Sequence, residues 1–551
     1  MWFDLTLCVI ICLALLSVAT ADIEPQPLPT GVRDNGINVL LDSAHDLSFY
    51  WMWESQDAIR NMGFRVTGSQ ATLHTVLTPG ALSRMRTQEN HAYEITNPDG
   101  TKGQLHRPMV MLPNPEFNVV VTYQFGECQD YMPEEINALR KFVQEGGGLV
   151  IFAQCPGKID KYPMAKLAEA FGADIIPTQV KGPFKAIEHP AAAHFRSPDD
   201  PNATAYYVDT AADWKPIITS AAGKSIVVVR ELGKGRIILV ADSRPTRDWM
   251  RTTSDRDPAA NFSWIGAMIE WAAGGKKPVG GSRGVPWENG GIGGAIFPEN
   301  QEIVAGVTFL YASNQMPGVL NCVRTRTKEV KSLLDKWLPS PVPKPDEFYL
   351  TAAAGSPGSG WAVNVYAPRA ADTCANDSDL NSLLSVMAHE IAHTMTGPVA
   401  SNGTSYGAFP GGDPMGLFSE AHAGYFQQRV GRALGFELDR RGLPGLARVD
   451  PTLRDLDLTN IPEGKVSWGW SKLWTIWEIL EYRYGEMWYA KWMKTIHETY
   501  KDDPHHIMSW QEVVVTMSNA IGEDLFPLMR SFGTSVVPPD GWNITPMKTL
   551  E

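Results

Sequence analysis

The sequence predicts an α/β unit with an open sheet, followed by an α+β unit whose C-terminal part is mainly helical. In the first half, short apolar runs typical of buried strands alternate with helical segments. A Gly/Pro-rich stretch then separates the two halves, and long amphipathic helices dominate the second half. Because 551 residues are too many for one hydrophobic core, we expect two to four domains.

The N-terminus has the pattern of a secretory signal peptide. An apolar run from Leu5 to Val18 ends in Ala19-Thr20-Ala21, so we expect a signal at 1–21, cleaved after Ala21. The run is shorter than the ~20 residues needed to cross a bilayer, and no later segment is long and apolar enough to span. The sequence therefore predicts a secreted, extracellular protein with no membrane span after signal removal. A retained N-terminal anchor is the alternative.

Cysteine usage and composition agree with export. The cysteines that remain after signal removal are Cys128, Cys155, Cys322 and Cys374. We favour disulfides Cys128–Cys155 and Cys322–Cys374, because each pair then stays within one domain. The Asn-x-Ser/Thr sequences compatible with a glycoprotein are at Asn202, Asn261, Asn376, Asn402 and Asn543. A net charge of -13 and the lack of a basic run argue against nucleic acid as a partner.

The first domain is expected at 36–273, after a Pro-rich lead at 22–35. Its predicted strands are 36–42, 117–123, 149–153, 225–230 and 236–241, and its predicted helices are 49–62, 133–143 and 261–273. Pro133 and the acids that follow it suit the first turn of a helix, and Gly146-Gly147-Gly148 suits its end. Strand, helix, glycine turn and strand make the βαβ rhythm of an open parallel sheet, while 233–235 predicts a hairpin.

Two segments of this domain carry a resemblance to a known fold family. Glu-Glu-Ile-x-x-Leu-x-x-Phe-Val-x-x-Gly-Gly-Gly-Leu and Gly-Lys-Gly-Arg-Ile-Ile-Leu-Val-Ala-Asp-Ser resemble class I glutamine-amidotransferase-like domains, which implies a flavodoxin-like α/β fold. Amidotransferases place their nucleophilic cysteine in Gly-x-Cys-x-Gly, whereas Cys155 is followed by Pro156. With His45 as base, a Cys155 amidohydrolase is one alternative, and a noncatalytic domain with Cys155 in a disulfide is the other.

The second domain is expected at 293–551, after a Gly/Pro linker at 274–292. A half-buried strand is predicted at 303–311, a helix at 327–337, and further strands at 348–351 and 361–366. The strand at 361–366 is either an edge that binds extended substrate or an ordinary core strand. Long helices rich in tryptophan follow at 468–484 and 487–500, where the aromatic stripe indicates core packing or a carbohydrate-stacking surface.

The most informative motif is His389-Glu390-Ile391-Ala392-His393 within a predicted helix. Residues four apart share one helix face, so His389 and His393 can both bind one zinc ion. Glu390 then lies beside the metal, where it can take a proton from the water that zinc acidifies. Apolar residues at helical spacing before the motif predict a buried back face: Leu380, Leu383, Leu384 and Met387.

A catalytic zinc needs a third protein ligand and an open position for water. Glu420, on a second predicted helix, is our candidate, and His422 is the rival. The two are about 200° apart around a helix, so they cannot both point at one ion. A chance motif in a structural helix is the alternative to the zinc site.

The order of these features resembles the gluzincin peptidases, and most closely the peptidase M60 (enhancin-like) family. The resemblance includes Trp-x-Lys-Leu-x-x-x-x-x-Ile-Leu in the tryptophan-rich helix and Asp-Leu-Phe-Pro-x-x-x-x-Phe-Gly near the end. It implies zinc ligands His389, His393 and Glu420 with Glu390 as general base and acid. The related aminopeptidases have a tyrosine where this chain has Trp470, so the oxyanion donor is open among Tyr406, Tyr425 and Tyr482.

We therefore expect a secreted zinc endopeptidase, a gluzincin metallopeptidase with Zn2+ as its cofactor. The resemblance implies protein, glycoprotein or mucin-like substrates. The alternative is a catalytically inactive extracellular binding or regulatory protein on the same scaffold.

Overall fold

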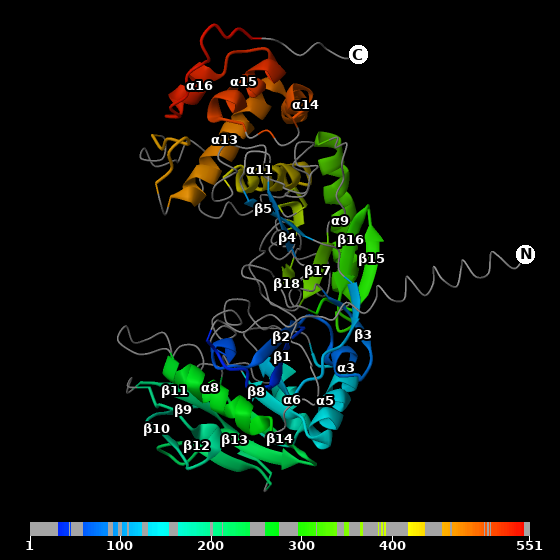
Figure 1. Cartoon of the computed structure of the whole chain (residues 1–551), viewed down its shortest axis with the longest axis vertical. Helices are drawn as coiled ribbons and strands as arrows, with labels where there is room; N and C mark the ends of the chain where they lie inside the picture. The colour runs from blue at the N-terminus through cyan, green and yellow to red at the C-terminus, as the bar shows by residue number, and fades with distance from the viewer. Residues whose placement is uncertain are drawn as a thin grey trace, which may run out of the picture.

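A computed structural model gives the arrangement of the chain (Figure 1). It describes residues 31–42, 44–45, 59–85, 92–96, 102–106, 110–123, 130–153, 163–198, 202–211, 213–242, 259–274, 296–315, 317–338, 347–351, 364–366, 384, 387–389, 391–392, 417–435, 455–462, 465–500, 502–503, 506 and 508–544. An α/β unit lies at one end and a helical unit at the other, with a small sheet between them. The predicted combination of an α/β part and a mainly helical C-terminal part is confirmed.

The α/β unit is built on a ten-stranded mixed sheet. Its parallel part comprises β1 (Asn38–Asp42), β2 (Arg65–Ser69), β7 (Val119–Tyr123), β8 (Gly148–Phe152) and β14 (Gly235–Val240). These strands lie in the order β2-β1-β7-β8-β14. Numbered along the chain, this is the 2-1-3-4-5 order of flavodoxin-like sheets, in which ligands bind at the carboxyl ends of the strands.

The rest of the sheet is antiparallel, and it extends well beyond the one hairpin that the sequence predicts. The antiparallel strands are β9 (Ala173–Lys181), β10 (Phe184–Ala186), β11 (Thr204–Thr210), β12 (Lys215–Ser220) and β13 (Ser225–Leu232). The predicted hairpin is confirmed, because β13 pairs antiparallel with β14 through the turn at Gly233, whose φ of 63° suits glycine. Two small ribbons also form: β3 (Leu82–Met85) with β6 (Val110–Pro113), and β4 (Ala92–Thr96) with β5 (Lys102–His106).

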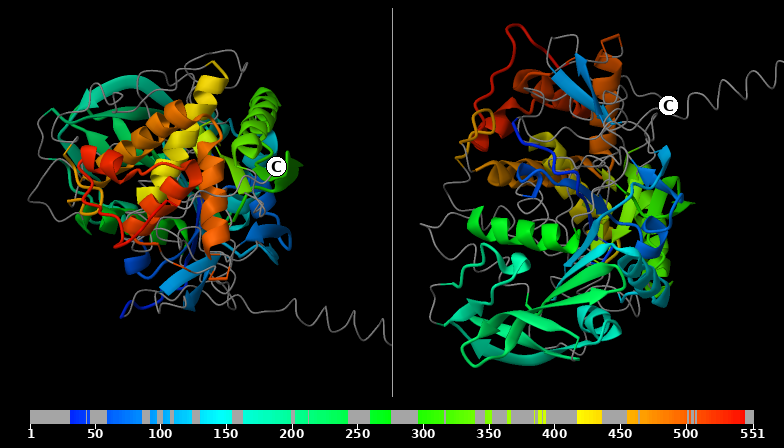
Figure 2. Two further views of the ribbon diagram at one scale, coloured as in Figure 1. Left: turned by 90° about the horizontal axis from the view of Figure 1, so that it is seen from above. Right: turned by 60° about the horizontal axis from the view of Figure 1, so that its bottom comes forward.

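Both faces of the sheet are covered, which is why its parallel strands are continuously apolar. On one face, Val39 and Leu41 pack with the buried residues Trp264 and Ile269 of α8 (Ala259–Ala272). On the opposite face, Leu40 belongs to the cluster that includes α5 (Pro133–Glu145) and α6 (Pro163–Ala170). Figure 2 shows α8 lying along one side of the sheet. The short α3 (Leu73–Val76) and the 3-10 helix η3 (Pro190–Ala192) complete the unit.

The start of the second unit is joined directly to the first. Ile296 is fully buried in the core of the α/β unit and pairs with β2, where its N–H donates to the Gly68 carbonyl at 3.1 Å. Three residues later, Glu299 Oε1 accepts hydrogen bonds from Thr72 Oγ1 and from the Ser313 N–H, both at 2.7 Å. The chain that follows the Gly/Pro linker therefore belongs partly to the first core, although we expected it only in the second domain.

A four-stranded sheet lies between the two ends of the molecule. Its order is β15 (Asn300–Val304), β16 (Val307–Tyr311), β17 (Glu347–Thr351) and β18 (Asn364–Tyr366). The single strand expected at 303–311 is wrong, because Ala305 and Gly306, with φ angles of 52° and 83°, form a hairpin turn between β15 and β16. The helix α9 (Pro317–Trp337) follows and is longer than the predicted 327–337.

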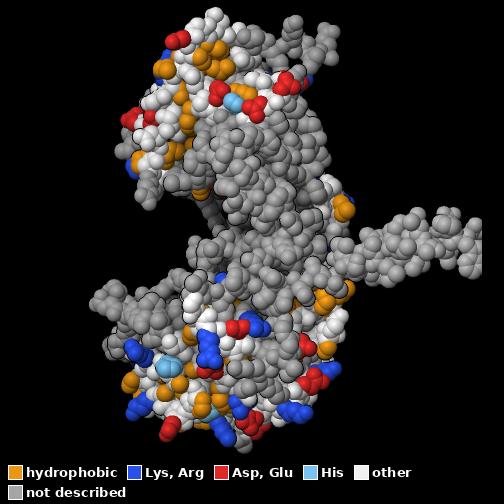
Figure 3. Space-filling view, viewed as in Figure 1, with side chains coloured by type: hydrophobic (Ala, Val, Ile, Leu, Met, Phe, Trp, Pro, Cys, Tyr) orange, Lys and Arg blue, Asp and Glu red, His pale blue; other side chains and the backbone are white. Residues whose placement is uncertain are grey.

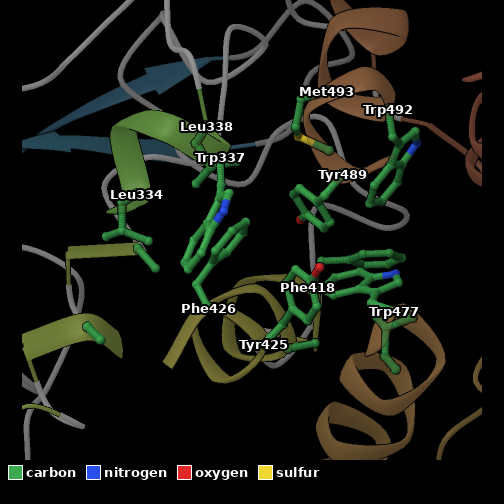
Figure 4. Packing of buried hydrophobic residues seen from close by; sticks show 14 of the residues in the cluster. Leu334, Trp337, Leu338, Phe418, Tyr425, Phe426, Trp477, Tyr489, Trp492 and Met493 are labelled. Carbon is green, nitrogen blue, oxygen red and sulfur yellow. The ribbon is translucent and has the colours of Figure 1, made fainter. Parts of the chain in front are cut away.

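The C-terminal part is an assembly of helices around an aromatic core. Its helices are α11 (Leu417–Ala433), α13 (Val466–Tyr484), α14 (Trp488–Tyr500), α15 (Trp510–Ile521) and α16 (Phe526–Ser531). Aromatic side chains from α9, α11, α13 and α14 point toward one another (Figure 4). Trp477, Trp488 and Trp492 are fully buried. The rings of Trp488 and Trp492 are stacked, with their centroids 6.0 Å apart. These tryptophans form core packing rather than a carbohydrate surface.

Cys322 of α9 is disulfide-bonded. Cys128, Cys155 and Cys374 lie outside the described residues, so both pairings remain predictions. On the face shown in Figure 3, acidic and basic side chains of the described residues are interspersed. Among the helices of the described chain, none combines the length and apolar character needed to cross a membrane.

Candidate metal centre

The predicted metal helix has one buried apolar face and a partly exposed histidine, as expected, where the structure describes it. Residues 387–389 and 391–392 are helical. Met387, Ala388 and Ile391 are fully buried, whereas the His389 side chain keeps 20% of its surface exposed. The predicted buried back face is therefore confirmed at Leu384 and Met387, both fully buried. Leu380, Leu383, Glu390 and His393 lie outside the described residues.

The second helix of the site, α11, presents Glu420 in its first turn. A carboxylate is favoured there, because the N-terminal end of a helix carries partial positive charge. Phe418 and Ala421 are buried, whereas the Glu420 side chain is 32% exposed. Phe418 and Ala421 thus pack the helix against the core, while the Glu420 carboxylate stays accessible.

The structure brings His389 and Glu420 together. The Nε2 atom of His389 lies 3.2 Å from Oε2 of Glu420, and its Nδ1 atom lies 3.0 Å from Oε1 of Gln427. One imidazole ring therefore contacts two side chains of α11. Our reading of the sequence missed Gln427, although its position seven residues after Glu420 places both on nearly the same helix face.

This geometry fits zinc at the described residues. Two ligand atoms on a tetrahedral zinc ion, each about 2.0–2.1 Å from the metal, lie roughly 3.3 Å apart. The 3.2 Å separation between His389 Nε2 and Glu420 Oε2 is compatible with that spacing. Among the described residues, no group of three or more His, Cys, Asp and Glu side chains is arranged around a common point. Two of the four predicted residues, Glu390 and His393, lie outside that part of the chain.

His422, the rival ligand, is a buried structural residue. Its Nε2–H donates to the Ala392 carbonyl at 2.8 Å, and its Nδ1 accepts from the Tyr489 hydroxyl at 2.8 Å. Burial lowers the pKa of His422 to about 4, so the ring is neutral near pH 7. With both nitrogens engaged, His422 connects α11 to the predicted metal helix at Ala392 and to α14 at Tyr489.

Two of the three tyrosines considered as oxyanion donors lie in unsuitable places. Tyr425 is fully buried, donates to Glu481 Oε2 at 3.1 Å and accepts from Trp488 Nε1 at 3.2 Å. Tyr482 is 93% exposed. Tyr406 lies outside the described residues. The geometry therefore gives no role at a metal to Tyr425.

The strand expected to bind extended substrate is partly described. β18 is the last strand of its four-stranded sheet and pairs only with β17 among the described strands. This agrees with the expected edge position at Asn364–Tyr366, while 361–363 lie outside the described residues. An edge strand of this kind has backbone groups available for pairing with a peptide.

A second polar cluster lies at the carboxyl end of β1 and contains His45. The ring is buried between Asp42, 3.1 Å from Nδ1, and Glu135, 3.1 Å from Nε2, and it stacks on Tyr131. Burial alone would lower the pKa of His45, but the two carboxylates raise it to about 10. A ring protonated at both nitrogens has no lone pair to accept a proton. The Cys155 alternative therefore loses His45 as its base, and Cys155 itself lies outside the described residues.

Comparisons with known proteins add no functional assignment. No family model and no curated protein matches the chain. Among solved structures, a cytoplasmic protein from Salmonella typhimurium is 14% identical over 43% of this chain and 98% of its own, with a TM-score of 0.26. A ThuA-like protein from Bacteroides uniformis is 11% identical over 45% of this chain and 95% of its own, also with a TM-score of 0.26. Similarity at this level supports no statement about activity.

Proposed function

We propose that the chain is a secreted zinc-dependent endopeptidase of the gluzincin type, most similar to the M60 family. The observation that carries the proposal is the contact between His389 Nε2 and Glu420 Oε2 at 3.2 Å. It joins the His-Glu-x-x-His motif to the carboxylate chosen from the sequence as third ligand. We also propose that the first domain is amidotransferase-like in fold. We propose no catalytic activity for it.

In this proposal His389, His393 and Glu420 hold the metal, and Glu390 performs proton transfer. When bound, zinc would acidify a water molecule and polarise the scissile carbonyl. Glu390 would accept the proton of the attacking water and then donate it to the leaving amine. No covalent bond between enzyme and substrate is needed. The edge of β18 would hold an extended peptide by backbone pairing, and the M60 resemblance suggests glycoprotein or mucin-like substrates.

The test of this proposal is the Glu390→Gln variant of the full mature chain. The amide keeps the size of the side chain but cannot accept a proton, so peptide hydrolysis should fall by at least about 100-fold. Zinc content should stay at the wild-type level. The assay should compare glycosylated and unglycosylated protein substrates. Hydrolysis by Glu390→Gln at the wild-type rate would exclude Glu390 as the base.

A further inference from the structure

We propose that Gln427 is a positioning residue that fixes the tautomer and orientation of His389 for metal binding. The inference rests on the proposed zinc site and adds a residue to it. Gln427 is not part of the His-Glu-x-x-His motif and is not a metal ligand. Its contact with the ring nitrogen that faces away from Glu420 is what assigns the role.

The arrangement on α11 makes this contact specific. Glu420 and Gln427 are seven residues apart, which is within about 20° of two full helical turns. Their backbone positions are thus separated by roughly 10 Å along one face of the helix. The imidazole of His389 lies between them, with Nε2 toward Glu420 and Nδ1 toward Gln427. Holding both ends of the ring sets its rotation as well as its position.

The atom types at the contact show which group donates at Nδ1. Oε1 of Gln427 is an amide carbonyl oxygen and can only accept, so Nδ1 of His389 must donate. A neutral imidazole with its proton on Nδ1 has its lone pair on Nε2. The Glu420 carboxylate beside Nε2 also only accepts, so this contact alone does not leave a lone pair there. With a metal bound between Nε2 and Glu420, the Nδ1–H held by Gln427 would leave the Nε2 lone pair for the ion. Histidines that bind metals usually donate their other N–H to an oxygen in this way.

His422, which lies on α11 between Glu420 and Gln427, has a different arrangement of hydrogen bonds from that of His389. Its Nε2–H donates to the Ala392 carbonyl, so the ring carries its proton on the other nitrogen. The lone pair of its Nδ1 is used by the Tyr489 hydroxyl. Of these two histidines, only His389 has a side-chain amide oxygen at one ring nitrogen and a carboxylate at the other. The two rings therefore differ in the partner of Nδ1, which is the Gln427 amide oxygen for His389 and the Tyr489 hydroxyl for His422.

The test measures zinc affinity in the full mature chain by competition with a chelator of known affinity. Gln427→Leu removes the acceptor at similar size and should weaken zinc binding by roughly 10- to 100-fold. Gln427→Glu keeps an accepting oxygen and should bind zinc at least as tightly as the wild type. Gln428→Leu is the matched control, because this neighbouring buried residue lies about 100° around the helix. It should leave zinc affinity unchanged.

Two further readouts separate a positioning role from a folding defect. Unfolding of the metal-free proteins by urea should show Gln427→Glu folded with wild-type cooperativity. The absorption spectrum of the Co2+-substituted protein should change in Gln427→Leu and not in Gln428→Leu. Suppose that the wild type binds zinc and that the zinc affinity of Gln427→Leu is within twofold of the wild-type affinity. The role of Gln427 is then wrong, while the proposed function stands. If the folded wild type binds no zinc, the proposed function fails and the inference fails with it.

Discussion

His389 and Glu420 are 31 residues apart in the sequence, yet their side chains meet at 3.2 Å. The contact places a histidine of the predicted metal helix against the first turn of α11. In the core beside this contact, His422 of α11 donates a hydrogen bond to the Ala392 carbonyl of the predicted metal helix. One histidine thus faces a site that could hold an ion, and the other holds the helices that form it.

The different roles of Glu420 and His422 can be separated by substitution. Glu420→Gln should lower zinc affinity, because a neutral amide is a far poorer zinc ligand than a carboxylate. His422→Phe should keep zinc but destabilise the protein by about 1–3 kcal/mol, because it leaves the Tyr489 hydroxyl and the Ala392 carbonyl without their buried partner. Chelator competition and urea unfolding measure the two effects. Zinc loss only in His422→Phe would reverse the assignment.

Tyr425 should contribute to stability and not to turnover. Its hydroxyl bonds to Glu481 and Trp488 within the core, so Tyr425→Phe should cost about 1–2 kcal/mol of unfolding free energy. At a temperature where both proteins are folded, kcat should match the wild type. Tyr482→Phe, at a 93% exposed position, should change neither quantity. A large fall in kcat for folded Tyr425→Phe would restore it as a candidate oxyanion donor.

Gly424 allows α11 and α13 to approach closely. A Cβ atom at this position would lie 2.2 Å from Cε3 of Trp474, and an indole ring cannot move aside easily. Gly424→Ala should therefore destabilise the protein by about 1–3 kcal/mol, despite the better helix propensity of alanine. Gly469→Ala is the matched comparison, since its Cβ would meet the flexible end of Ile461. Calorimetry should show the larger loss for Gly424→Ala; equal losses would contradict this account.

The ion cluster around His45 should stabilise the α/β unit in a pH-dependent way. Its pKa rises from the ordinary value of 6.5 to about 10 in the folded protein. Below pH 6.5 folded and unfolded chains both carry the proton, whereas between pH 6.5 and 10 only the folded chain keeps it. The stability difference between wild type and His45→Gln should therefore shrink with rising pH, by up to about 1.4 kcal/mol per pH unit.

Urea unfolding at about pH 6, 7.5 and 9 would measure this trend. Asp34→Asn provides the control, because it removes a more exposed ion pair, with Arg65, that contains no histidine. Its effect should be at most about 1 kcal/mol and independent of pH. A His45→Gln difference that is constant or grows with pH would contradict the assignment of a protonated ring.

The sequence predicted the elements whose signals are local. β1, β7 and β8 are continuous apolar runs, and α5 begins at Pro133 and ends before Gly146. The hairpin between β15 and β16 was missed because Val304 to Val307 looks like one apolar run, although Gly306 marks its turn. α15 was missed despite a readable capping box, in which the Ser509 hydroxyl accepts from the Glu512 N–H.

Contacts between distant segments could not be predicted in this way. Glu135 looked like an ordinary acidic residue in the first turn of a helix, but it also accepts from His45 and from the Leu73 N–H. Asn314, which lies 3.2 Å from His45, comes from beyond the interdomain linker. For the proposed metal site, helix spacing left both Glu420 and His422 as candidate ligands, and only the fold showed that His422 faces the core.

The most direct test of the proposed zinc site is the metal content of the purified mature protein and of its His393→Ala variant. We expect one zinc ion per chain in the wild type and its loss from the variant, because two remaining ligands do not hold zinc tightly. Circular dichroism would establish that both proteins are folded. Folded wild-type protein without zinc, even after incubation with Zn2+, would contradict the proposal and leave a binding protein on a peptidase-like scaffold.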